Sequence, residues 1–214
     1  MIFYKNYPVF PYSIKPLNYA KRDIAHRRKF IGKKWQNEYY YYIEREKYSV
    51  SLNFNFENYE EMTQIKDFVF DRQGRAKLFW MPTWNNDLVP IKKVNNLDTK
   101  IVIKQSFFDI YKTTKRPLII YIPTIDFISY VINVEENYDD TLDKVVDTIS
   151  IADAIPDNLE PETCPPIQFL FLGRFSSDTV SFKFIDLFRG ECGVNFSELS
   201  IYDYKRYIPE VVVL

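Results

Sequence analysis

The sequence predicts a mainly β protein (a β-rich α+β fold), built as a barrel or sandwich with one packed helix and a smaller β unit at the C-terminal end. One segment alternates strictly between apolar and polar residues, as a strand with one buried face does. Only one segment shows firm helical spacing. Aromatic residues make up 18% of the 214-residue chain. Strands and protein interfaces both favour aromatic side chains, and the two uses do not exclude each other.

Residues 1–20 predict an extended N-terminal arm. Pro8, Pro11 and Pro16 oppose a helix here, and the segment is too apolar for a solvated tail. We expect the arm to lie along a surface, either of its own chain or of a neighbour. Its aromatic residues are candidates for contacts with neighbouring chains: Phe3, Tyr4, Tyr7, Phe10 and Tyr12.

Residues 21–135 predict the main β core. The clearest strand runs from Tyr48 to Phe56, where apolar side chains alternate with Ser and Asn. Residues 39–43 belong to the same strand or to the one before it. Further strands are expected at residues 77–83, 100–104, 117–122 and 127–134.

A helix is predicted within this core at residues 58–73. Asn58 is a suitable N-cap, and Gly74 is well placed to end the helix. Glu60 and Glu61 lie in the first turn, where the helix dipole favours acidic side chains. The apolar stripe expected to face the core consists of Met62, Ile65, Phe68 and Val69.

The acidic, proline-containing residues 136–166 predict a linker or an excursion between two parts of the chain. Residues 167–214 then predict a smaller β unit, with strands at 168–172, 179–185 and 193–199. Its apolar tail is expected to pair with a neighbouring chain or within its own unit. The tail residues offered as interface candidates are Val211, Val212, Val213 and Leu214.

Charge is balanced overall but divided along the chain. There are 28 Lys and Arg against 29 Asp and Glu, so direct recognition of nucleic acid is not expected. Residues 15–47 are basic and residues 135–162 are acidic. These blocks are either two solvated faces or complementary patches that steer one subunit onto the next. Insertion into a membrane is not expected either, since no apolar run is long enough.

The residue types that usually carry chemistry are sparse. The chain has one histidine, His26, and two distant cysteines, Cys164 and Cys192. No zinc-ligand spacing or glycine-rich phosphate loop is present. A glycosidase would need two carboxylates facing each other in space, and the sequence singles out no such pair. We therefore predict no catalytic residue, no cofactor and no metal, and a protein that is not an enzyme.

Two aromatic-rich motifs stand out instead. The first carries Arg72-Gln73-Gly74-Arg75, followed by Phe-Trp-Met-Pro-Thr-Trp and an Asp-Leu pair; its notable members are Gly74, Arg75, Phe79, Trp80, Pro82, Trp84 and Asp87. The second runs from Phe169 to Val180, with a later Phe-Ser-Glu-Leu; its notable members are Arg174, Asp178 and Glu198. The simplest interpretation of the first motif is a well-packed helix–strand unit. A tryptophan pocket for a ligand is the alternative.

These motifs, with Arg27-Arg28 and Trp35 before a Tyr-rich strand, resemble tail proteins of double-stranded DNA bacteriophages. The similarity is to distal-tail or baseplate-type structural proteins, which also occur in prophage particles and gene transfer agents. The resemblance implies a virion component at the tail tube, tail tip or baseplate, assembled in the bacterial host cytoplasm. Its partners would be copies of itself in a ring and other tail proteins (tube, hub, fibre or adaptor). The alternative is a tail-tip module that binds host-surface glycan through Tyr and Trp.

Overall fold

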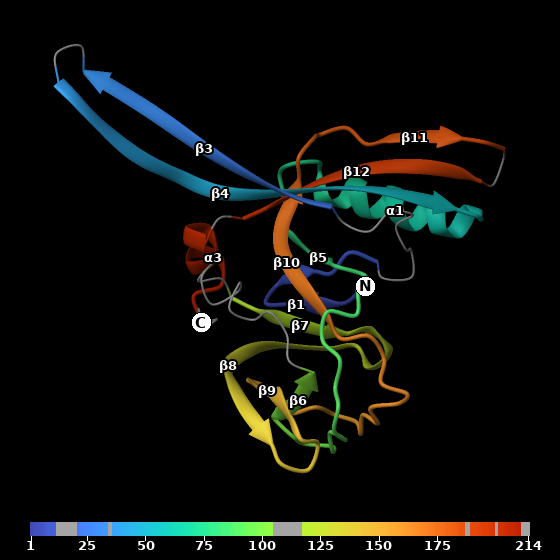
Figure 1. The fold of residues 1–214 in the computed structure, drawn as a ribbon. Helices are drawn as coiled ribbons and strands as arrows, with labels where there is room; N and C mark the ends of the chain where they lie inside the picture. The colour runs from blue at the N-terminus through green and yellow to red at the C-terminus, as the bar shows by residue number, and fades with distance from the viewer. Residues whose placement is uncertain (12–20, 34–35, 105–116, 187–188, 200, 211–214) are drawn as a thin grey trace.

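The computed structural model describes residues 1–11, 21–33, 36–104, 117–186, 189–199 and 201–210; for 21–33, 36–49 and 201–202 it describes the backbone only. Figure 1 shows the arrangement of its elements. The strands are β1 (Phe3–Tyr4), β2 (Tyr7–Pro8), β3 (Lys21–Lys33), β4 (Gln36–Phe56), β5 (Phe79–Pro82), β6 (Lys100–Lys104), β7 (Ile119–Ile122), β8 (Phe127–Asp139), β9 (Lys144–Ile151), β10 (Gln168–Phe175), β11 (Ser181–Phe184) and β12 (Gly190–Glu198). The helices are α1 (Tyr59–Arg72), the 3-10 turn η1 (Pro123–Ile125) and α3 (Ile201–Tyr207).

The strands form an antiparallel sheet in the order β3-β4-β12-β10-β7-β8-β9-β6. β5 also pairs with β10, β11 pairs with β12, and β1 and β2 form a separate small sheet. A bulge between Val131 and Asn133 of β8 interrupts the register with β9, and such bulges bend a strand. The predicted mainly β fold with one main helix is confirmed.

The predicted division of the chain is wrong in two places. β12 lies between β4 and β10, and β10 pairs with β5 and β7, so residues 167–210 complete the main sheet rather than form a second unit. The segment 136–166 is not a linker, because it contains β9, which pairs with both β8 and β6. The first correction comes from pairings between segments far apart in sequence, for which local patterns carry no signal. The second comes partly from a local hairpin, β8–β9, whose second strand was not predicted.

Helix α1 forms where the sequence predicts it. The Asn58 side chain accepts a hydrogen bond from the Glu61 backbone N–H at 2.9 Å, which satisfies one free donor of the first turn. Met62, Ile65 and Phe68 are buried on the inner side. The helix ends at Gln73, whose φ of 52° is left-handed, and Gly74 follows with a φ of 61°.

Strand β10 has both faces buried. Phe169, Phe171 and Phe175 belong to the core that contains the α1 side chains. The alternate residues Leu170 and Leu172 belong to a second core. The second core also contains Val9 and Trp80. Tyr204 of α3 and Ile208, which follows that helix, complete it. The α3 helix was not predicted from the sequence.

Candidate functional site

The two sequence motifs meet at the end of α1. The Arg75 guanidinium donates to Asp178 Oδ2 from Nε at 3.1 Å and from Nη2 at 2.7 Å, and the Arg75 backbone N–H donates to Oδ1 at 3.0 Å. These hydrogen bonds hold the pKa of the Asp178 carboxyl below its usual value. A side chain at Gly74 would have its Cβ 2.6 Å from the Asp178 Cα. The close approach and the positive φ both require glycine here.

Three residues of the first motif lie in strand β5, and two of them, Phe79 and Trp80, pack into different cores. Phe79 is fully buried, with its ring centroid 4.6 Å from that of Phe175. Trp80 points to the other core and donates from Nε1 to the Tyr4 carbonyl oxygen at 2.9 Å. Pro82 ends the strand opposite Leu170. These side chains stabilise the fold and leave no tryptophan surface at Trp80 for a ligand.

Trp84 and Asp87 fix the loop that follows β5. The Trp84 backbone N–H donates to the Gln168 side chain at 3.0 Å, and the Trp84 ring packs edge-on against Phe54. Asp87 accepts from the Phe169 backbone N–H at 2.8 Å and from the Thr83 hydroxyl. The Asp87 carboxylate therefore holds the first residues of β10 in place.

Glu198 and Arg174 lie on neighbouring strands but in different surroundings. Glu198 is buried and accepts a hydrogen bond from the Tyr204 hydroxyl at 3.2 Å, while that hydroxyl accepts from the Leu172 backbone N–H at 2.8 Å. Arg174 is exposed and lines a cavity of about 400 Å³ with Arg72. Apart from Arg174, the motif residues thus tie elements of the fold together.

Most of the N-terminal interface candidates contact their own chain. Phe10 is 1% exposed and stacks on Phe54, so the expectation that it reaches a neighbour is wrong. Tyr4 packs on Trp80, and burial raises the pKa of its hydroxyl. Tyr7 is half-buried, and Phe3 is exposed. Tyr12 and Val211, Val212, Val213 and Leu214 lie outside the described residues.

The most distinctive surface is a long two-stranded ribbon made of β3 and the first part of β4 (Figure 1). β3 pairs with β4 from Lys21↔Ser51 to Lys33↔Gln36. β12 joins β4 only at residues 49–56. In the part of the chain that the structure describes, residues 36–48 of β4 therefore pair with β3 alone, and the outer edge of β3 has no partner strand. The sequence predicted strands at residues 39–43 and 48–56, within β4, but it predicted no strand at β3.

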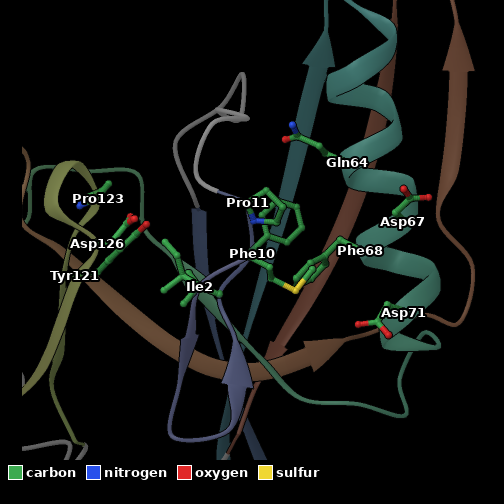
Figure 2. Close-up of a pocket in the computed structure, with 12 residues that line it drawn as sticks. Ile2, Phe10, Pro11, Gln64, Asp67, Phe68, Asp71, Tyr121, Pro123 and Asp126 are labelled. Atoms are coloured by element: carbon green, nitrogen blue, oxygen red, sulfur yellow. The ribbon is translucent and has the colours of Figure 1, made fainter.

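A second surface feature is a groove of about 710 Å³ between the N-terminal segment, α1 and the turn η1. Figure 2 shows Ile2, Phe10 and Phe68 between Asp67 on one side and Asp126 on the other. Apolar side chains line most of it, and carboxylates stand at its sides. Neither Asp67 nor Asp126 was singled out from the sequence, because they come together only through the fold.

The thiols of the described residues are held in their neutral form. Burial raises the pKa of Cys192 to about 12, and burial also raises the pKa of Cys164; both cysteines are free. Among the residues that the structure describes, no group of three or more His, Cys, Asp and Glu could hold a metal ion. No described helix has the length and hydrophobicity that crossing a membrane requires. The His26 side chain lies outside the described residues.

Comparison with known proteins adds no family. No model of a known protein family matches the chain, and no curated protein matches it.

Proposed function

We propose that this protein is a structural component of a phage or phage-like virion tail, and that it forms a ring or adaptor through contacts with its own copies and with neighbouring tail proteins. The observation that carries the proposal is the β3–β4 ribbon, whose two edges lack a partner strand in the described part of the chain. The motifs that resemble distal-tail and baseplate proteins supply the tail context.

A ribbon of this length with unpaired edges is well suited to joining one chain to another. β3 has 13 residues, which is about 40 Å of extended chain. An isolated two-stranded ribbon is marginal in water, because it buries little apolar surface. Its free backbone N–H and C=O groups are a template for another strand, and strand addition supplies both hydrogen bonds and burial. A second chain is therefore the expected source of stabilisation.

The charge of the ribbon restricts which surface can receive it. β3 contains six Lys or Arg residues and one Asp. Residues 36–48 of β4 add two basic and three acidic residues, so the ribbon stays basic overall. Cationic residues on edge strands discourage indiscriminate pairing, because like charges repel when identical edges meet. The ribbon is thus suited to an acidic acceptor rather than to edge-to-edge aggregation.

A non-catalytic role fits the use that the fold makes of its motif carboxylates. Asp87 holds a backbone N–H of β10, Asp178 holds Arg75, and Glu198 holds the Tyr204 hydroxyl. Each of these carboxylates holds another part of the fold in place. This use supports the proposal that the chain works by binding other protein chains.

The direct test is the state of the purified full-length chain. We expect light scattering to give a multimer at micromolar concentration, and electron microscopy of the same sample to show closed rings of one size. A monomer at every concentration would contradict the proposal. A monomer that also binds bacterial surface sugars on a glycan array would favour the alternative tail-tip module.

A further inference from the structure

We propose that the groove between the N-terminal segment, α1 and η1 is the acceptor for the far end of the β3–β4 ribbon of a second copy of this chain. This inference rests on the proposed self-association and specifies its two surfaces. The far end of the ribbon is defined here as residues 29–33 together with the start of β4 at Gln36.

The groove offers apolar contact between two negative groups. Its floor includes Ile2, Phe10 and Phe68, and its volume is about 710 Å³. Asp67 stands on the α1 side and Asp126 on the η1 side, as Figure 2 shows. An occupant that fits must therefore bring both apolar surface and positive charge.

The two carboxylates are available to an incoming cation. Within the described residues, the Asp67 and Asp126 side chains make no hydrogen bond or ion pair, and both residues are exposed. The third carboxylate of the groove differs, because Asp71 pairs with Arg72 and lies 3.8 Å from the Lys77 ammonium. The hydrogen bond from Arg72 holds the pKa of Asp71 below its usual value. The negative charge of Asp71 is thus already balanced by Arg72 and Lys77 of the same chain.

The far end of the ribbon has the matching composition. Residues 29–33 carry Lys29 and Lys33 around Phe30 and Ile31, with no acidic residue among them. The facing residues 36–42 of β4 add four tyrosines and one acid, Glu38. Figure 1 shows the ribbon extending away from α1 and from the N-terminal segment of the same copy. A second copy is therefore the occupant to which the geometry points.

The acidic β8–β9 hairpin is the weaker acceptor. Part of its charge is already used, since Asp139 forms an ion pair with Lys92 and Asp143 accepts a hydrogen bond from the Tyr138 hydroxyl. Asp147 is 3% exposed.

The ribbon and the groove are different surfaces of one chain, so the contact is heterologous. Repeating such a contact gives a ring where the rotation closes and a filament where it does not. The inference thus accounts for a ring without a second type of subunit.

Carbodiimide cross-linking tests the contact in the native assembly. This reagent joins carboxylates directly to amines, and a mixture of unlabelled and nitrogen-15-labelled full-length chains identifies links between copies by mass spectrometry. We expect links between copies from Asp67 or Asp126 to Lys29 or Lys33. Intermolecular links confined to other acids, such as Glu135 and Glu136 of β8, would overturn the inference.

Charge reversal tests whether the contact stabilises assembly. In the test variant, Asp67→Lys is combined with Asp126→Asn, because Asn tolerates the φ of 50° at position 126. The control variant, Asp157→Lys with Glu162→Gln, makes the same change in net charge at exposed sites outside the groove. We expect the test variant to raise the concentration for half-assembly about tenfold or more, since like charges then face each other. The control should stay near the native value.

A rescue variant separates electrostatic complementarity from a general loss of structure. Adding Lys29→Glu and Lys33→Glu to the test variant should restore assembly, while the same ribbon changes alone should weaken it. If the test variant assembles like the control, the groove is not the acceptor, although self-association still stands. If the native chain is a monomer throughout, the proposed function fails together with this inference.

Discussion

Strand β10 and the β3–β4 ribbon are both rich in aromatic residues, yet their surroundings are opposite. β10 pairs with β5 on one edge and with β12 and β7 on the other, and both of its faces are buried. In the part of the chain that the structure describes, residues 36–48 of β4 pair with β3 alone, so this part of the ribbon pairs only with itself. Composition alone therefore does not say whether aromatic residues serve the fold or an interface.

The difference predicts two separate kinds of effect. Substitutions around β10 should lower the free energy of unfolding, because they remove packed side chains or force them apart. Changes in the ribbon should leave the free energy of unfolding of the body nearly unchanged and alter assembly.

Phe79→Ala should cause the largest loss. The Phe79 ring is fully buried, and its centroid lies 5.1 Å from that of Phe68. We expect urea unfolding to show a loss of about 3–5 kcal/mol, the usual cost of removing a buried phenylalanine ring. The matched control is Phe70→Ala on α1, where the side chain is 84% exposed; its effect should stay within about 0.5 kcal/mol. Equal effects would mean that the assigned burial is wrong.

Gly173→Ala should have the next largest effect. A Cβ at this position of β10 would collide with the Ser197 carbonyl oxygen and the Phe196 ring. We expect a loss of about 1–3 kcal/mol in urea unfolding, as for other overpacked cores. Gly193→Ala is the control, because its Cβ would meet only the Asn53 side chain, at 3.4 Å. A neutral Gly173→Ala would contradict the close packing of β10 against β12.

Asp178→Asn should have a small effect that depends on pH. Hydrogen bonds from Arg75 lower the pKa of Asp178 from its ordinary value of 3.8. The pair therefore stabilises the native state fully above that ordinary pKa, and the gain is lost as the pH falls through the lowered native pKa. Thermal unfolding should show native chain and variant differing at pH 7 and converging below pH 3.8. The control is Asp157→Asn, which removes a carboxylate at an exposed site away from Arg75; its effect on thermal unfolding at pH 7 should be small.

Local features of the sequence were sufficient for α1 and for most strands. The Asn58 cap, the apolar stripe and Gly74 are all within one helix, so they indicate its bounds directly. The strand expected at residues 100–104 is found at Lys100–Lys104. The alternation before α1 is confirmed, since Leu52, Phe54 and Phe56 are buried.

The long-range arrangement could not be predicted in the same way. β12 lies beside β4, with Val194 opposite Leu52, and these two residues are far apart in the sequence. The helix α3 has only seven residues, too few for a periodic pattern to emerge. The motif residues were found, but their contacts were not, as the pairing of Arg75 with Asp178 shows. The groove acids Asp67 and Asp126 belong to segments far apart in sequence, so no local pattern could indicate that they lie at one groove.

The central claim is that the ribbon holds copies of the chain together. Replacing residues 24–48 by Asn-Gly would join Asp23 to Ser49, which already face each other in register, through a two-residue hairpin turn. We expect the urea midpoint to change little, since residues 36–48 of β4 pair with β3 alone in the part of the chain that the structure describes. Light scattering should give a multimer for the native chain and a single chain for the variant. A variant that assembles to the same mass as the native chain would contradict the account.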